Sequence, residues 1–312
     1  MQSEKFHDFD EFSTSVHGVE SRMLLRNPKR RFWSVSAVAL GEIDVQWGRL
    51  GSGNIAQGQL RPDRFIFYAP LSSEARYTVN GSILQENSFA ILEPGCEFCV
   101  STEIEHDWFT ALIPSHMLSQ VGADSLSRST RVSDSNALVA NRFRTVLEQI
   151  FSAAATCAAF KSSLAAHRAA VELVRVCAEI AGDQRPIESH YGGRPRYSRQ
   201  EIIRRSMELI ESNRSQRMNW PDVNDLSANA NVSERTLRTS FKEFFDVGPN
   251  EYLQLRRLHE VYNALRTAKP DEFAVSQILL EHGEWAFGRF AARYKVLFGE
   301  LPSETLLRPP KY

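Results

Sequence analysis

The sequence predicts an α+β fold. We expect an N-terminal β domain that carries two long helices and a C-terminal all-α domain of two helix-turn-helix units joined by a long helix. Short alternating segments recur over residues 31–114, and amphipathic helical segments follow over 115–182. A pattern of short helix, tight turn, second helix and Gly/Pro stop then occurs twice near the C-terminus. These patterns predict a first domain over 1–182, a linker over 183–197 and a second domain over 198–312.

Length and composition are those of an ordinary globular protein with two domains. The chain has 312 residues, of which 42% are hydrophobic and 24% charged, and its formal net charge is -1. Any attraction to nucleic acid must therefore come from a local patch. No apolar run reaches the ~20 residues of a membrane span, and the polar, acidic N-terminus does not resemble a signal peptide. We expect a cytoplasmic protein with no membrane partner.

The β region over 31–114 consists of short segments typical of strands. Ile43, Val45 and Trp47 alternate with polar residues, as in a strand with one buried face. The Asn80-Gly81 pair lies between two apolar runs and predicts a two-residue hairpin, because both residues accept a positive φ. The regular spacing of the segments predicts a sandwich or a small barrel that ends at Pro114.

Two amphipathic helices are expected after the β region. The apolar positions of the first helix share one face: Val139, Phe143, Val146, Leu147 and Ile150. The second helix has a broader apolar surface between Leu164 and Ile180. These helices either pack back onto the β domain or pair between subunits, and we expect a homodimer. Residues 183–197 are rich in Pro, Gly and charge, which predicts a flexible linker.

The first helix-turn-helix unit, over 222–246, carries the most informative surface. Ser233 is placed to cap its second helix, and Leu237 and Phe241 fall on the buried face of that helix. The opposite face has the donors that a helix in the DNA major groove needs: Arg235, Arg238, Thr239 and Lys242. Arg and Thr suit contacts with bases, whereas the more distant Lys242 suits a phosphate. A solvated helix face is the alternative interpretation.

The second unit, over 274–298, has fewer side chains that could contact bases. Its second helix is expected over about 285–297, with Arg289 and Arg293 as exposed donors among small residues. We expect mostly backbone contacts here, with Arg289 the best candidate for a base. A connecting helix over 249–268 begins with a proline and should hold the two recognition helices ~34 Å apart, about one duplex turn.

Residues 197–308 resemble the AraC/XylS transcription regulators. The resemblance lies in the VSERTL-x3-FKEFF segment, the P-x2-Y-L that follows, the RRL at 256–258, and four single positions: Gly283, Phe290, Gly299 and Pro302. It implies base contacts from Arg235, Arg238 and Thr239 in the first unit and from Arg289 in the second. The β region also looks like the cupin-like, effector-sensing domain of that family. The expected partners are double-stranded DNA, a small-molecule effector, RNA polymerase and a second copy of the chain.

Three positions depart from the family pattern. Asn231 and Asp246 stand where the family usually has glycine, and both residue types tolerate left-handed geometry. Glu284 stands where the family usually has a buried aromatic residue. Either Trp285 swings in to replace that aromatic side chain, or the second unit is less well packed.

The aromatic residues of the β region either line an effector pocket or simply fill a core. The candidate ligand-binding residues are Trp47, Phe67, Arg76, Phe98, His106 and Trp108, with Arg76 or His106 as the polar anchor. Since the β region holds only one histidine, His106, we expect no metal, no cofactor and no catalysis. The alternatives are an enzyme or thiol-based sensor that uses Cys96 and Cys99, and an effector-independent regulator whose β domain serves only for dimerisation.

Overall fold

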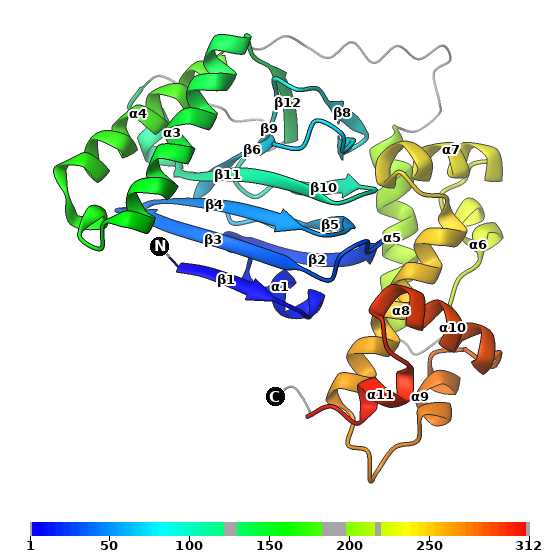
Figure 1. Cartoon of the computed structure of the whole chain (residues 1–312). Helices are drawn as coiled ribbons and strands as arrows, with labels where there is room; N and C mark the ends of the chain where they lie inside the picture. The colour runs from blue at the N-terminus through cyan, green and yellow to red at the C-terminus, as the bar shows by residue number, and fades with distance from the viewer. Residues whose placement is uncertain (1, 122–129, 183–197, 216–219, 310–312) are drawn as a thin grey trace. The chain divides into compact units, whose positions relative to one another are not determined.

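The computed structural model describes residues 2–121, 130–182, 198–215 and 220–309. The chain divides into two compact units, Met1–Met23 with Asn27–Gly192 and Leu24–Arg26 with Gly193–Tyr312. The first unit is rich in strands and the second is helical, which confirms the predicted α+β class (Figure 1). The predicted linker lies outside the described residues. No helix within those residues is long and apolar enough to cross a membrane.

The first unit contains two sheets (Figure 1). The described strands of the larger sheet, in spatial order, are β1 (Gln2–Phe6), β3 (Trp33–Leu40), β4 (Ile43–Leu50), β11 (His106–Pro114), β6 (Arg64–Pro70), β9 (Ser88–Leu92) and β12 (Thr130–Asp134). Those of the smaller sheet are β2 (Val19–Arg26), β5 (Gly53–Leu60), β10 (Glu97–Thr102), β7 (Tyr77–Val79) and β8 (Ser82–Leu84). This arrangement agrees with the predicted sandwich or small barrel.

The predicted hairpin is confirmed, but the predicted β region was too narrow. Val79 pairs with Ser82 across Asn80 and Gly81, whose φ angles are 47° and 86°. Strands β1 and β2, with helix α1 (Phe9–Ser15) between them, precede residue 31, and β12 follows Pro114. The N-terminal segments mix polar and apolar residues without a clean period of two. Their strand character depends on pairing with distant segments, as β1 pairs with β3.

Two long helices cover one face of the larger sheet. After the short helix α2 (Ser115–Ser119), α3 (Ala137–Thr156) and α4 (Leu164–Gly182) lie side by side, drawn in green in Figure 1. Phe151 of α3 stacks on Phe109 of β11 with 5.7 Å between the ring centroids, and Phe143 meets Phe89 of β9 edge-on at 5.1 Å. Of the two predicted roles of these helices, packing onto the β domain is therefore realised. Dimerisation stays a prediction.

The second unit contains both predicted helix-turn-helix units and the helix between them. Its described helices are α5 (Arg199–Ser215), α6 (Val223–Asn229), α7 (Glu234–Phe245), α8 (Pro249–Thr267), α9 (Val275–Glu281), α10 (Phe287–Phe298) and α11 (Pro302–Leu306). On α8, Tyr252 stacks on Phe245 of α7 and Tyr262 stacks on Phe298 of α10, each with 4.5 Å between centroids. The connecting helix therefore holds both second helices by direct ring packing.

Candidate nucleic-acid interface and internal cavity

Helix α7 has one buried and one exposed face, as its sequence predicts. The Ser233 hydroxyl accepts a hydrogen bond from the backbone N–H of Thr236 at 3.2 Å, which caps the helix start. Leu237 and Phe241 are fully buried against the rest of the unit. The four predicted DNA-contacting side chains of this helix all lie on the exposed face: Arg235, Arg238, Thr239 and Lys242. The turn before and the cap after α7 use Asn231 and Asp246 with φ of 54° and 59°, which confirms that both residues accept left-handed geometry.

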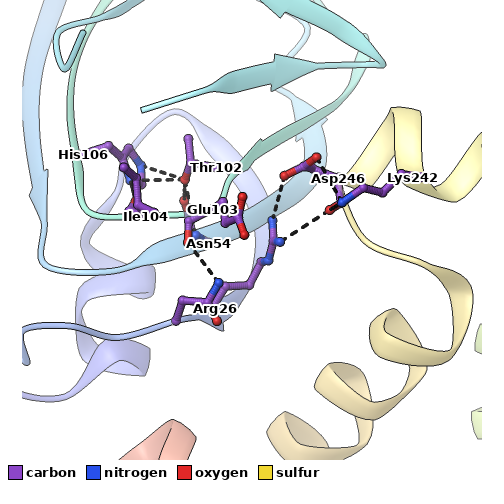
Figure 2. Close-up of polar contacts among 9 residues, drawn as sticks. Arg26, Asn54, Thr102, Glu103, Ile104, His106, Lys242 and Asp246 are labelled. Carbon is purple, nitrogen blue, oxygen red and sulfur yellow. Dashed lines mark hydrogen bonds and ion pairs between the residues drawn. The ribbon is translucent and has the colours of Figure 1, made fainter. Parts of the chain in front are cut away.

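Contacts within α7 hold three of these exposed side chains in place. A carboxylate oxygen of Glu234 accepts a hydrogen bond from Arg238 at 2.9 Å, and the Thr239 hydroxyl donates to the Arg235 carbonyl at 3.0 Å. Lys242 donates through Nζ to the carbonyl of Asp246 at 2.8 Å (Figure 2). Lys242 thus satisfies the C-terminal end of its own helix, where a cation is favourable. Its predicted phosphate contact would require this bond to be shared or exchanged.

Helix α10 presents fewer donors. Arg289 and Arg293 are exposed and lie four residues apart, so they share one face of the helix. The helix begins at Phe287, two residues later than predicted, and Ala286 at its N-cap position has no side chain that can accept a hydrogen bond from the first turn. On the buried face, the Tyr294 hydroxyl donates to Thr305 of α11 at 2.7 Å. This packing orients the helix without the help of a cap.

An ion pair replaces the missing aromatic residue in the turn of the second unit. Glu284 accepts a hydrogen bond from Arg257 of α8 at 2.7 Å, and both side chains are largely buried. The Arg257 guanidinium in turn lies 5.3 Å from the centre of the Trp220 ring. Trp285 is 83% exposed, so it does not swing into the core. The turn is fixed to α8 by charge rather than by an apolar side chain.

A cavity lies inside the first unit, between its two sheets. It is lined by α1 and by residues of β4, β6, β9 and β11 from one sheet and β2, β5 and β10 from the other. About 620 Å³ of it is free of protein atoms, including the part that is open to solvent.

The cavity contains three of the six predicted ligand-binding residues. Phe98, His106 and Trp108 line it. The prediction is wrong for Trp47 and Phe67, which point to the opposite face of the larger sheet and pack in the core beneath α3 and α4. Arg76 is exposed outside the cavity, in the segment between β6 and β7. The six predicted residues include aromatic side chains from both faces of the sheet, whereas successive side chains of a strand point to opposite sides.

The same alternation could have identified the polar lining residues that were missed. Thr110 lies two residues beyond Trp108 on β11, and Tyr68 is its direct partner on β6. Gln46 on β4 is the partner of Thr110 on the other side. All three line the cavity. These residues line the cavity because of where they fall in the alternation of each strand and how the strands pair. Neither property can be read from the aromatic residues alone.

His106 is buried at one end of the cavity and is held as a neutral ring. Its Nδ1 lies 3.1 Å from the Ser52 carbonyl and 3.0 Å from the Ile104 carbonyl, so it donates a proton there. The Thr102 hydroxyl lies 3.1 Å from the same nitrogen and donates to Oδ1 of Asn54 at 3.0 Å (Figure 2). Burial lowers the pKa of His106 to about 4. A polar anchor at His106 would therefore be a neutral ring.

The cysteine pair considered for a thiol sensor is unsuited to that chemistry. Cys96 and Cys99 are both buried and unbonded to each other. Burial raises the pKa of both thiols, which disfavours the reactive thiolate. Within the described part of the chain, no group of three or more His, Cys, Asp or Glu residues is arranged to hold a metal ion.

Breaking the Arg257–Glu284 ion pair should destabilise the second unit. Glu284→Gln is expected to lower the free energy of unfolding by about 1–2 kcal/mol, because a largely buried guanidinium loses its charged partner. Denaturant unfolding followed by circular dichroism measures this change. Glu281→Gln is the matched control, since Glu281 is exposed and accepts a hydrogen bond from Gln277 at 3.1 Å on its own helix. Equal effects of the two substitutions would show that the ion pair does not hold the turn.

The stability of the β domain should fall in mild acid because of His106. Its pKa is lowered from 6.5 to about 4, so between these values the unfolded chain binds a proton that the folded state does not. Unfolding free energy should therefore decrease by about 3 kcal/mol as pH falls from 7 to 4. The nearest titratable ring, Tyr77 at 5.5 Å, does not interfere, because burial raises its pKa above 10. Denaturant unfolding at a series of pH values should show this slope in the native chain and a smaller one in His106→Gln.

Comparison with known proteins agrees with the helical geometry. Residues 226–308 match the helix-turn-helix domain family. XylDLEGF operon transcriptional activator 3 of Pseudomonas putida is 33% identical over 104 residues, which are 33% of this chain and 30% of that protein. The probable thc operon regulatory protein of Rhodococcus erythropolis is 30% identical over 109 residues, which are 35% of this chain and 32% of that protein. The matches thus span about a third of these relatives.

A solved structure of similar fold is that of the AraC-like transcriptional activator CuxR. It is 12% identical, the match covers 84% of this chain and 95% of that chain, and the TM-score is 0.43. A likeness at this level carries no conclusion about function. The sequence matches lie in the part of the chain that folds as two helix-turn-helix units around α8. The C-terminal part of the chain, over residues 226–308, is therefore a helix-turn-helix domain similar in sequence to those of these operon regulators.

Proposed function

We propose that this protein regulates transcription by binding a specific site on double-stranded DNA with α7 and α10. The observation that carries the proposal is the exposed stripe of Arg235, Arg238, Thr239 and Lys242 on the second helix of a helix-turn-helix unit. The net charge of -1 does not favour general attraction to DNA. A local stripe of hydrogen-bond donors on one exposed helix face, of residue types that can contact base edges, supports binding to a specific sequence.

The two units are proposed to contribute unequally. Helix α7 offers two arginines and a threonine, which can contact base edges in the major groove. On α10, Arg289 is proposed to contact a base and Arg293 a phosphate, because the neighbouring small residues have little reach. Both helices stack on α8, which fixes their spacing before DNA binds. Binding with both helices therefore needs no loss of conformational entropy to set that spacing.

The internal cavity is proposed to bind a small-molecule effector, with Phe98, His106 and Trp108 among its ligand contacts. A domain that served only for dimerisation would have no need of polar groups in an otherwise apolar interior. A thiol sensor is disfavoured by the raised pKa of both buried cysteines. Contact with RNA polymerase, expected from the family resemblance, stays a prediction.

Substitution of Arg238 tests the contact with bases. Arg238→Ala should weaken binding to the specific site by about 1–3 kcal/mol while leaving binding to random duplex nearly unchanged. The measurement is best made in a Glu234→Gln background, which removes the carboxylate that Arg238 would leave unpaired beside the DNA. The specific site itself is obtained by selecting bound genomic fragments.

Arg293→Ala is the matched control, because it removes an exposed arginine from α10. It should weaken specific and random binding alike and reduce the salt dependence of binding, as loss of a phosphate contact does. Equal losses on both duplexes for Arg238→Ala would assign Arg238 to the DNA backbone instead.

A homodimer is also proposed, through the outer surface of α3 and α4. Leu138, Leu164 and Val171 are exposed on these helices although they are large and apolar. Replacing Leu138 and Leu164 together with glutamate should convert a dimer to monomers in sedimentation equilibrium, because charge would be buried in the interface. The same replacement at the exposed Val296 of α10 is the control and should leave the mass unchanged. A wild-type protein that sediments as a monomer would exclude the dimer.

A further inference from the structure

The cavity wall formed by the larger sheet is organised in rows that follow the strand register. One row contains Gln46, Thr110 and Tyr68, on β4, β11 and β6 in turn. The row on one side of it contains Gly48 and Trp108. In the row on the other side, Ile66 and Leu92 line the cavity, whereas Leu112 and its β4 partner Asp44 do not. Within the cavity lining, Gln46, Thr110 and Tyr68 thus form a polar row among mainly apolar neighbours.

Two hydroxyl groups in the polar row have no hydrogen-bond partner. Among the described residues, neither the Tyr68 hydroxyl nor the Thr110 hydroxyl is bonded, and both oxygen atoms are buried. Both residues are only 7% exposed and both line the cavity. The third member of the row, Gln46, is satisfied, because its amide bonds the backbone N–H and carbonyl of His17, each at 3.0 Å. Leaving two buried hydroxyls unpaired is costly unless a guest pairs with them.

The cavity has no charged group that could neutralise an ionic guest. Of the described residues that line it, none is Lys, Arg, Asp or Glu. Burial raises the pKa of Tyr68 well above 10, so this side chain stays a neutral donor. His17 lies at the exposed mouth, where an ion would remain in water. A buried carboxylate or phosphate would therefore lose its hydration without gaining a counter-charge.

The shape of the wall adds a further restriction. Trp108 lies directly on Gly48, where an added Cβ would be 2.1 Å from the indole ring. The absence of a side chain at Gly48 lets the indole lie flat against the sheet, and Tyr68 stacks beside it at 6.1 Å. This leaves an aromatic surface next to the free hydroxyls. A ligand with an apolar group and a neighbouring oxygen atom could contact the aromatic surface with the first and the unpaired hydroxyls with the second.

We propose that the cavity binds an uncharged, largely apolar small molecule through one hydroxyl or carbonyl oxygen, which the Tyr68 and Thr110 hydroxyls hold. The regulatory consequence of this binding rests on the proposed function, but the chemical class of the ligand does not. The donor and acceptor capacity of two hydroxyls on paired residues of one cavity wall fits an alcohol, a phenol or a ketone equally well. A carboxylic acid in its ionised form is excluded from the site by desolvation.

Three probes with one carbon skeleton test this assignment on the full chain. These are 2-phenylethanol, ethylbenzene and phenylacetate, which are a neutral alcohol, a hydrocarbon and an anion. Isothermal titration should show binding of the two neutral probes and none of phenylacetate. Tyr68→Phe and Thr110→Val should each weaken 2-phenylethanol about 3- to 10-fold, as loss of one hydrogen bond does. Ethylbenzene should bind the same variants as well as or better than the native protein.

The variants also carry their own folding control. Removing an unpaired buried hydroxyl while keeping the shape should leave the melting temperature of the unliganded protein unchanged or raised. Gly48→Ala provides an independent check, because its methyl group pushes Trp108 into the cavity and should abolish binding of both neutral probes. His17→Ala should change none of the affinities, since His17 lies at the mouth.

Three results would overturn the proposal. These are binding of phenylacetate within tenfold of 2-phenylethanol, equal effects of Tyr68→Phe on both neutral probes, and no binding of any probe. The effect of each bound probe on affinity for the selected DNA site separates this inference from the proposed function. Binding as expected without any effect on DNA affinity removes the effector role and leaves the ligand class. Binding of phenylacetate together with an effect on DNA affinity would overturn the ligand class and support the effector role.

Discussion

Successive side chains of a β-strand point to opposite faces, and this constraint organises the whole β domain. In β11, Phe109 points into the core beneath α3 and α4, while Trp108 and Thr110 point into the cavity. The same division runs through β4 and β6, because the register keeps like-facing residues side by side. One sheet thereby supplies a packed core on one face and an open, partly polar wall on the other.

The helical unit depends on a different constraint, which is the central position of α8. Its Tyr252 and Tyr262 stack on α7 and α10, and its Arg257 holds Glu284 in the turn of the second unit. Aromatic stacking tolerates little displacement, and a largely buried ion pair strongly resists separation. The two exposed helix faces are therefore fixed relative to each other through one element. This gives physical grounds for treating the two units as a single binding surface despite their unequal side chains.

The predicted helices agreed closely with the structure wherever their end signals were local. Ser233 caps α7 and Pro249 begins α8, because each signal acts within one turn of its own residue. The ligand residues were predicted less well. Trp47 and Phe67 were chosen for their aromatic character, but their position in the strand turns them toward the helices. Tyr68 and Thr110 belong to the cavity because of their pairing across two strands, which no local pattern in the sequence states.

The sequence by itself determined the fold class, both helix-turn-helix units and the exposed donors of α7, since helix periodicity and capping are local properties. Only the tertiary structure decided what holds Glu284, because Arg257 lies far from it in the sequence and meets it through the packing of α8. It likewise decided which face of each strand lines the cavity and which buried hydroxyls stay unpaired there. These are properties of long-range contacts, and their energies depend on burial and partners that exist only once the chain has folded.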